Sequence, residues 1–407
     1  MNAPATSTAA ALREHGKPLR PTRLEILALL ALALFERVVC WHQRPPDMGI
    51  FLEPWFAHIV RYGPIQAFAH PFSNYEPAYL YLLALGSLAH QLLAPITIIK
   101  ILSVAGTLFM TAAFADLLKA LGVDRRGALL LLVLPSVAIN DALLAQCDAL
   151  WAGSCMLALA AVIRGKTLKS MIWCGVAFAF KAQAAFIAPV MIGAMIGQKA
   201  PRWQWTVPGL VFLATLVPPW LLGWPGIKLL TVYLDQASID HLAGRLANPW
   251  MLGTMFGEET ARQWFVLGYA AAIAAAITIA ALAARTARDP KLLVLLAALA
   301  GTALPFLLPK MLERYYFLGD VMTLAVALSM RNRPASFAVR AVQLASILTH
   351  FSYLYFFYDP WPALVGAVFA AAGLGAMCML AAPSFAALVA DLRAAFQKRL
   401  SAVATAS

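Results

Sequence analysis

The feature that most constrains this chain is a succession of apolar runs separated by short polar segments. The 407 residues are 62% hydrophobic and only 12% charged, whereas a soluble domain carries roughly 25% charged residues. A helix that crosses a bilayer needs about 20 mostly apolar residues. The sequence therefore predicts an all-α polytopic membrane protein.

Twelve segments are predicted to span the membrane, although several of them are short. They are 23–41, 95–118, 127–141, 148–163, 168–183, 184–198, 203–222, 263–284, 291–309, 315–330, 336–357 and 361–382. They form a single transmembrane domain, 23–382, between a cytoplasmic tail of residues 1–22 and a second cytoplasmic tail, 383–407. Long loops at 42–94 and 223–262 are expected on the outer side.

The distribution of Lys and Arg decides the treatment of the apolar segment 78–92. If this segment lies along the outer interface instead of spanning, 21 of the 31 Lys and Arg fall on one side with only six of the 19 acidic residues. Loops rich in Lys and Arg mark the cytoplasmic side. We therefore expect a multi-pass protein of the inner membrane with both termini cytoplasmic and non-spanning helices in the first outer loop. The scattered cations form no basic patch, which argues against a nucleic-acid partner.

Ionisable side chains gather at the outer ends of the predicted spans. The stretch from Trp41 to Pro77 contains Asp47, Glu53 and Glu76, and further charges lie at other outer helix ends. Ionisable groups at membrane depth are costly and usually mark a site or a water-filled cavity. The sequence therefore predicts a functional site on the outer face, with loop 223–262 as its cover.

Several separated patches carry a recognisable pattern. They are R-P-P-D-M-G-I-F with P-F-S-N-Y-E-P-A-Y-L, N-D-A-L-L-A-Q-C-D-A-L-W-A, F-K-A-Q, L-A-N-P-W-M-L and P-K-M-L-E-R-Y-Y-F. Together they resemble the GT-C superfamily of polyprenyl-phosphate-sugar-dependent membrane glycosyltransferases. Ala182 stands where the family's K-P-Q has proline, and Leu312 stands where the M-H-E-R-Y-F-F of lipid-linked mannosyl- and glucosyltransferases has histidine.

The resemblance implies a GT-C-like helical bundle and a defined reaction. The protein would be an inverting hexosyltransferase that moves a monosaccharide, with mannose as the first guess, from a polyprenyl-phosphate donor. The acceptor would be a hydroxyl of a glycolipid or glycan on the outer, periplasmic face. No Gly-rich phosphate loop is present, and a nucleotide-sugar enzyme would need its site in the cytoplasm, so a lipid-linked donor is favoured.

Asp47 is the predicted catalytic base. An attacking hydroxyl must lose a proton, which requires a carboxylate within hydrogen-bond reach. Asp47 is the first carboxylate after the first predicted span and follows two prolines that stiffen its approach. The resemblance implies the same role. The alternative is a loop aspartate that caps a helix or forms an ion pair.

Cations are needed to stabilise the phosphate that leaves with the lipid. Arg314 is the preferred phosphate ligand because a guanidinium can hold two phosphate oxygens at once. Lys181, Lys310 and Lys100 are the further candidates. A lysine that only extends its ammonium to the membrane surface is the alternative for each of them.

Five further residues of these patches are expected to bind substrate. They are Asp148, Glu313, Gln183, Asn248 and Tyr75. Asp148 has an alternative role as the N-terminal acid of its helix, where the helix dipole favours a negative charge. No cofactor is required, although Asp47 and Asp148 together are a lesser candidate for a divalent metal site.

A secondary transporter or lipid or sugar flippase is the competing class, because twelve spans also suit transporters. Transporter sites usually lie near the bilayer midplane between repeated halves. The middles of the predicted spans carry no evident acids, and residues 1–200 do not echo 201–407 in loop length. The sequence therefore favours a transferase, with the lipid bilayer, the lipid-linked donor and the acceptor as its partners.

Overall fold

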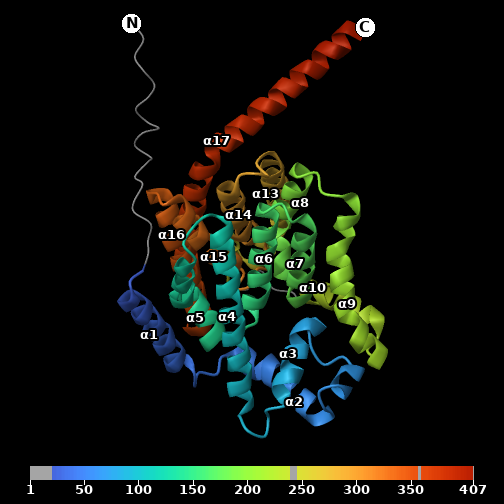
Figure 1. Cartoon of the computed structure of the whole chain (residues 1–407), viewed down its shortest axis with the longest axis vertical. Coiled ribbons are helices and arrows are strands. Elements are labelled where there is room, and N and C mark those ends of the chain that lie inside the picture. Colours follow the sequence, from blue (N-terminus) through green and yellow to red (C-terminus); the bar gives the residue numbers. More distant parts are fainter. Residues whose placement is uncertain (1–20, 239–244, 356–358, 407) are drawn as a thin grey trace.

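The computed structural model describes residues 21–238, 245–355 and 359–406 (Figure 1). Within these ranges the chain forms helices and no β-strand. The α-helices are α1 (Arg23–Cys40), α2 (Glu53–Tyr62), α3 (Pro77–Ser87), α4 (Pro95–Ala120), α5 (Pro135–Ala138), α6 (Asp148–Ile163), α7 (Thr167–Phe180), α8 (Ala188–Gly197), α9 (Val207–Leu222), α10 (Gly226–Ser238), α11 (Gly253–Phe256), α12 (Glu258–Gln263), α13 (Phe265–Arg285), α14 (Pro290–Leu307), α15 (Phe317–Met330), α16 (Arg333–Tyr355) and α17 (Trp361–Ala406).

Shorter 3-10 and π-helical turns connect or extend these helices. They are η1 (Met48–Leu52), η2 (Gln66–Ala69), η3 (Arg125–Val133), η4 (Ile139–Leu143), η5 (Ala182–Ile187), η6 (Arg202–Thr206) and η7 (Pro249–Leu252). The all-helical, multi-pass character is confirmed, and helix lies at each of the twelve predicted segments.

The prediction of about 12 spans is not confirmed. Among the described residues, five helical segments are long and apolar enough to cross a membrane, namely Pro95–Ala120, Arg202–Leu222, Phe265–Arg285, Pro290–Leu307 and Trp361–Gln397. A sixth forms if the bent pair Arg125–Val133 and Pro135–Leu143 counts as one span. The pair bends by 62° at a proline, which cannot continue the hydrogen-bond ladder of a helix.

The C-terminal end of the domain is not separated from the predicted tail by a break in the helix. The predicted tail 383–407 continues the last span as one helix, because α17 runs through Pro383 to Ala406. In the first loop, α3 has only 11 residues, about 16 Å at 1.5 Å per residue, which is too short to span. Figure 1 shows α2 and α3 together at one end of the molecule, opposite the second half of α17.

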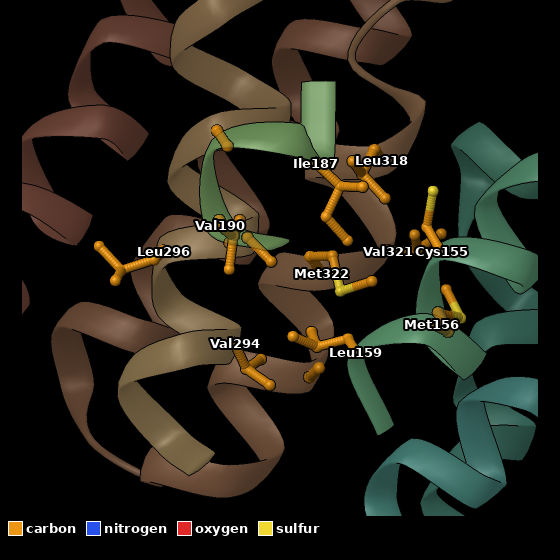
Figure 2. Packing of buried hydrophobic residues seen from close by; sticks show 14 of the residues in the cluster. Cys155, Met156, Leu159, Ile187, Val190, Val294, Leu296, Leu318, Val321 and Met322 are labelled. Atoms are coloured by element: carbon orange, nitrogen blue, oxygen red, sulfur yellow. The ribbon is translucent and has the colours of Figure 1, made fainter. Parts of the chain in front are cut away.

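The core lies between helices that are far apart in sequence. Side chains of α6, α8, α14 and α15 form one continuous cluster of buried apolar residues (Figure 2). Small residues allow the closest approach: a Cβ on Gly193 or Gly197 of α8 would lie 2.1 Å from the carbonyl oxygen of Ala280 or Ala284 of α13. Glycine spaced by four residues is a common way to bring membrane helices together.

Helix α1 is held by its second half. Its buried residues are Ala33 and Arg37, and leucines along its length remain exposed. The Arg37 guanidinium donates to the Ala33 and Leu132 carbonyls, both at 2.9 Å, and to Asp141 Oδ2 at 2.8 Å. This buried ion pair fixes the point at which α1 delivers the chain to the first loop.

Replacing Arg37 should destabilise the protein strongly. Arg37→Met leaves the Asp141 carboxylate buried without its cation, and breaking a buried pair in this way costs about 3–5 kcal/mol. The apparent melting temperature, followed by intrinsic fluorescence, is expected to fall by several degrees. Arg23→Met, at the exposed start of the same helix, is the matched control. Equal melting temperatures for the two variants would contradict the anchoring role of Arg37.

Candidate active site

Asp47 lies at the wall of a cavity of about 510 Å³. The chain reaches it through Pro45 and Pro46, directly after α1, and Asp47 precedes the turn η1. The cavity wall also includes residues of α2, α10, η5 and α16 and the connection between α14 and α15. Segments distant in sequence therefore converge on one concave site, which is the usual form of a small-molecule site.

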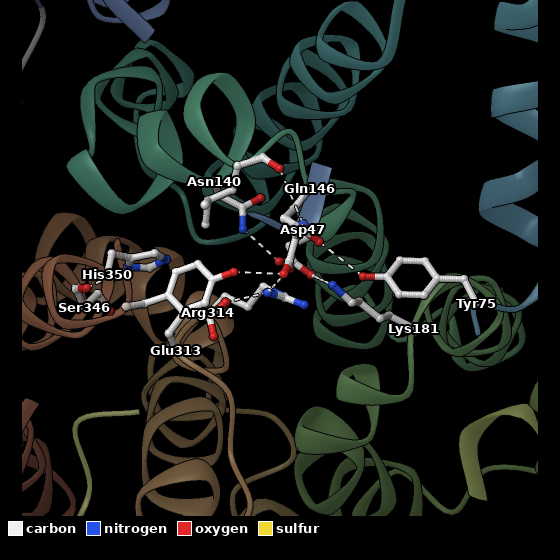
Figure 3. A network of polar contacts seen from close by, with 12 residues as sticks. Asp47, Tyr75, Asn140, Gln146, Lys181, Glu313, Arg314, Ser346 and His350 are labelled. Atoms are coloured by element: carbon white, nitrogen blue, oxygen red, sulfur yellow. Dashed lines mark hydrogen bonds and ion pairs between the residues drawn. The ribbon is translucent and has the colours of Figure 1, made fainter. Parts of the chain in front are cut away.

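The Asp47 carboxylate has a partner on each oxygen. Arg314 Nη1 donates to Oδ2 at 2.9 Å, and the Tyr353 hydroxyl donates to Oδ1 at 2.9 Å. Gln146 Nε2 approaches Oδ2 at 3.5 Å, and the Tyr75 hydroxyl donates to Gln146 Oε1 at 3.2 Å. Figure 3 shows Asp47 at the centre of this network. These hydrogen bonds fix the orientation of the Asp47 carboxylate at the cavity wall.

Arg314 forms ion pairs with two carboxylates of the site, Asp47 and Glu313. Its Nη1 also bonds the carboxylate of Glu313, which is 2% exposed. Burial disfavours the charge of Arg314, but the Glu313 and Asp47 carboxylates outweigh burial and raise its pKa well above the ordinary value. Burial raises the pKa of Glu313, against the lowering effect of Arg314. The buried Nε of Arg314 has no hydrogen-bond partner among the described residues.

Lys181 lines the same cavity, and Asp148, which lies outside the cavity wall, orients its ammonium group. It lies in extended backbone between α7 and η5, and its Nζ contacts Asp148 Oδ1 at 2.5 Å. Asn140 Nδ2 and Trp151 Nε1 donate to the same carboxylate at 2.7 and 2.8 Å. The ammonium also lies 5.2 Å from the centre of the Tyr75 ring. Asp148 is therefore placed to position Lys181.

Seven of the ten predicted site residues line the cavity. They are Asp47, Arg314, Lys181, Lys310, Glu313, Gln183 and Tyr75. The buried Gln183 Oε1 has no hydrogen-bond partner, which suits a ligand hydroxyl. The distant sequence patches thus bring seven predicted residues to one cavity.

Three predicted residues lie outside the cavity wall. The Lys100 ammonium donates to the carbonyls of Cys40, Trp41 and Gln43 at 2.7, 2.7 and 2.8 Å, so its three donors hold the start of the first loop. Asn248 caps η7 through Trp250 N at 3.1 Å. Asp148 lies behind Lys181. Lys100 therefore stabilises the first loop, and its ammonium has no donor left for a phosphate.

The structure adds residues that sequence reasoning did not select. Tyr353 and Gln146 bond Asp47, and Tyr233 and Gln236 of α10 line the cavity with Asn74. Gln236 Nε2 donates to the Asn74 carbonyl, which joins the second outer loop to the first. Gln146 lies in one of the sequence patches named above, but no periodicity distinguishes Tyr353 from Tyr355 of the same helix.

One buried acid was overlooked within a predicted span. Asp320 of α15 is 1% exposed, and Ser346 Oγ lies 2.8 and 2.9 Å from its two oxygens. His350 Nδ1 lies 2.7 Å from the Ser346 carbonyl, one turn along α16. The sequence prediction concerned the middles of the spans, whereas Asp320 lies in the first turn of α15.

The described residues contain no group of three or more His, Cys, Asp and Glu side chains arranged to hold a metal ion. Asp47 and Asp148 are each paired with a cationic side chain. Comparison of the chain with known protein families finds no matching family model, and comparison with curated proteins finds no match. The interpretation of the cavity therefore rests on its own geometry.

Glu76 is a buried carboxyl without a partner. It lies directly before α3 and is 1% exposed, and neither carboxylate oxygen has a hydrogen-bond partner. Burial raises its pKa to about 8. The neutral acid is therefore the favoured form near pH 7, which lowers the cost of burying it beside the site.

Glu76 should make stability depend on pH. Its folded-state pKa lies above the ordinary value of 4.5, so the native state binds the additional proton between these two values and stability falls as pH rises through that window. Glu76→Gln is expected to raise the apparent melting temperature by a few degrees at pH 8 and to change it little at pH 5. The exposed Glu259→Gln serves as control. A pH-independent difference between Glu76→Gln and the wild type would refute this account.

Proposed function

We propose that this protein is an inverting glycosyltransferase that transfers a hexose from a polyprenyl-phosphate donor to a glycolipid or glycan hydroxyl. One observation carries the proposal. A carboxylate, Asp47, and a guanidinium, Arg314, separated by 267 positions in the chain, meet at the wall of one cavity. Lys181 and Lys310 line the same cavity. This combination supplies a base and a phosphate-binding group, which are the two requirements of the reaction.

In the proposed reaction the acceptor hydroxyl attacks the anomeric carbon. Its proton passes to Asp47, a new bond forms between the acceptor oxygen and the anomeric carbon, and the bond from that carbon to the phosphate oxygen breaks. Both electrons of the broken bond leave with the lipid phosphate. Tyr353 orients the carboxylate through its hydrogen bond to Oδ1, while Oδ2 faces Arg314.

The leaving phosphate gains negative charge and needs cations nearby. Arg314 would bind it through two N–H groups, and Lys181 would add a point charge from the opposite wall. Donor binding then changes the ion pair of the ligand-free protein, because the phosphate competes with Asp47 for the Arg314 donors. Release from Arg314 leaves Asp47 Oδ2 without its guanidinium donor, so that this oxygen can accept the proton of the acceptor hydroxyl.

Asp47→Asn tests the base. The amide keeps the size of the side chain but accepts no proton, so transfer is expected to fall by roughly 100-fold or more. Purified protein would be incubated with polyprenyl-phosphate mannose, glucose and arabinose, and donor consumption followed for each. Glu53→Gln, which removes another first-loop carboxylate paired with Arg44, should retain activity. Full turnover by Asp47→Asn would sink the assignment.

Arg314→Ala tests the phosphate site. Loss of a charge-assisted hydrogen bond costs roughly 1.5–3 kcal/mol, which corresponds to about a 10- to 100-fold weaker donor affinity. Binding would be measured with the donor that the wild type consumes, and Arg61→Ala, at an exposed position of α2, is the control. An unchanged donor affinity would exclude Arg314 as the phosphate ligand.

The Asp320, Ser346 and His350 contacts favour a second candidate, a secondary transporter. A buried ionisable group inside a membrane bundle is a functional-site hypothesis in its own right. A transporter would move its substrate across proteoliposomes without chemical change, and Asp320→Asn would stop that movement. Donor cleavage that persists in Asp320→Asn would favour the transferase.

A further inference from the structure

A second concave site lies at the other end of α1. A groove of about 790 Å³ is bounded by the first half of α1, the end of α4 with η3, the start of α14 and the end of α15. Helix α1 has 18 residues, about 27 Å at 1.5 Å per residue. Helix α1 begins at this groove and ends shortly before Asp47, so the length of the helix separates the two sites.

The groove exists because the buried residues of α1 lie only in its second half. Ala33 and Arg37 are its buried residues, and Arg37 ties that half to Leu132 and Asp141. The first half has no such anchor, and its Leu24 and Leu27 are 77% and 64% exposed. The space between this half of α1 and η3 is therefore an open slot with an apolar lining.

The lining of the groove has two chemically distinct parts. Leu29 and Leu32 of α1 face Leu130 and Leu328 across an apolar slot. The rim is polar and contains three exposed cations, Arg126, Lys291 and Arg331. An apolar slot that ends in a cluster of cations matches the shape and charge of a phospholipid whose headgroup is anionic.

The two acids of the rim are bonded to backbone amides. Glu25 accepts from Thr22 N at 2.6 Å in the capping box of α1. Asp124 accepts from Arg126 N at 2.9 Å. Their charges serve the starts of α1 and η3. The cations come from three different elements, the start of η3, the start of α14 and the end of α15, and converge on one rim.

We infer that this groove binds an anionic phospholipid, with its phosphate among Arg126, Lys291 and Arg331 and its acyl chains along the leucines of α1 and η3. The N-terminal segment of the chain is a poor occupant by charge, because residues 1–20 contain three cations and one acid and would be repelled by the rim. The bound lipid fills the gap beside α1 and steadies the helix that leads to Asp47. Lipid binding in this groove does not require the proposed transfer reaction.

Native mass spectrometry of the full-length protein in detergent tests the inference. Phosphatidylglycerol and phosphatidylcholine of equal chain length would be titrated separately, together with inorganic phosphate alone. Wild type is expected to bind one phosphatidylglycerol in preference to phosphatidylcholine. Replacing Arg126, Lys291 and Arg331 together by Gln should weaken that binding roughly 100-fold, since each cation near an anionic lipid surface contributes about a fivefold change in affinity.

Two control variants separate the groove from general charge. The triple variant Lys166→Gln, Lys169→Gln and Arg340→Gln removes exposed cations outside the groove lining and should bind phosphatidylglycerol like the wild type. Ala28→Trp keeps the cations but fills the slot, and should also weaken lipid binding. Equal binding of both lipids, equal loss in the control triple variant, or tight binding of inorganic phosphate alone would each overturn the inference.

Discussion

The ion pair between Asp47 and Arg314 is the interaction on which the candidate site depends. It joins the segment that follows α1 to the connection between α14 and α15, across 267 positions of sequence. An unpaired charge at this depth would carry a large desolvation cost, so the pair favours the arrangement in which these segments meet. The same two groups are those that a transfer from a lipid phosphate requires, as base and as phosphate ligand.

The rule that buried charges are paired explains other parts of the structure. Arg37 with Asp141 fixes α1, and Lys181 with Asp148 sets a cavity wall. Lys100 is satisfied by three backbone carbonyls at the start of the first loop. Glu76 has no hydrogen-bond partner among the described residues, and burial therefore favours its neutral, protonated form. Polar contacts thus position the first loop, while the apolar helices build the scaffold around it.

Helix α1 connects the groove lined by Arg126, Lys291 and Arg331 with the segment that leads to the Asp47 cavity. Its far end leads to Asp47, and its near end borders the lipid-sized groove. Because only Ala33 and Arg37 bury α1 against the bundle, whatever fills the groove contributes to the position of the helix. The cationic rim lies at the end that the distribution of Lys and Arg predicts to be cytoplasmic, whereas the Asp47 cavity lies toward the predicted outer face.

The sequence by itself determined the helical membrane class, because apolar runs in this length and number have no other stable form, and it selected Asp47, Lys181 and Arg314, because charges at helix ends are few. Its prediction of about 12 spans is not confirmed, since hydropathy does not register the 62° bend before Pro135 or the 3-10 turn that shortens α8. Only the tertiary structure decided that Asp148 and Lys100 stand behind the cavity and that Tyr353 reaches Asp47. Those outcomes depend on which side chains meet across distant helices, and neither charge nor periodicity along one segment carries that information.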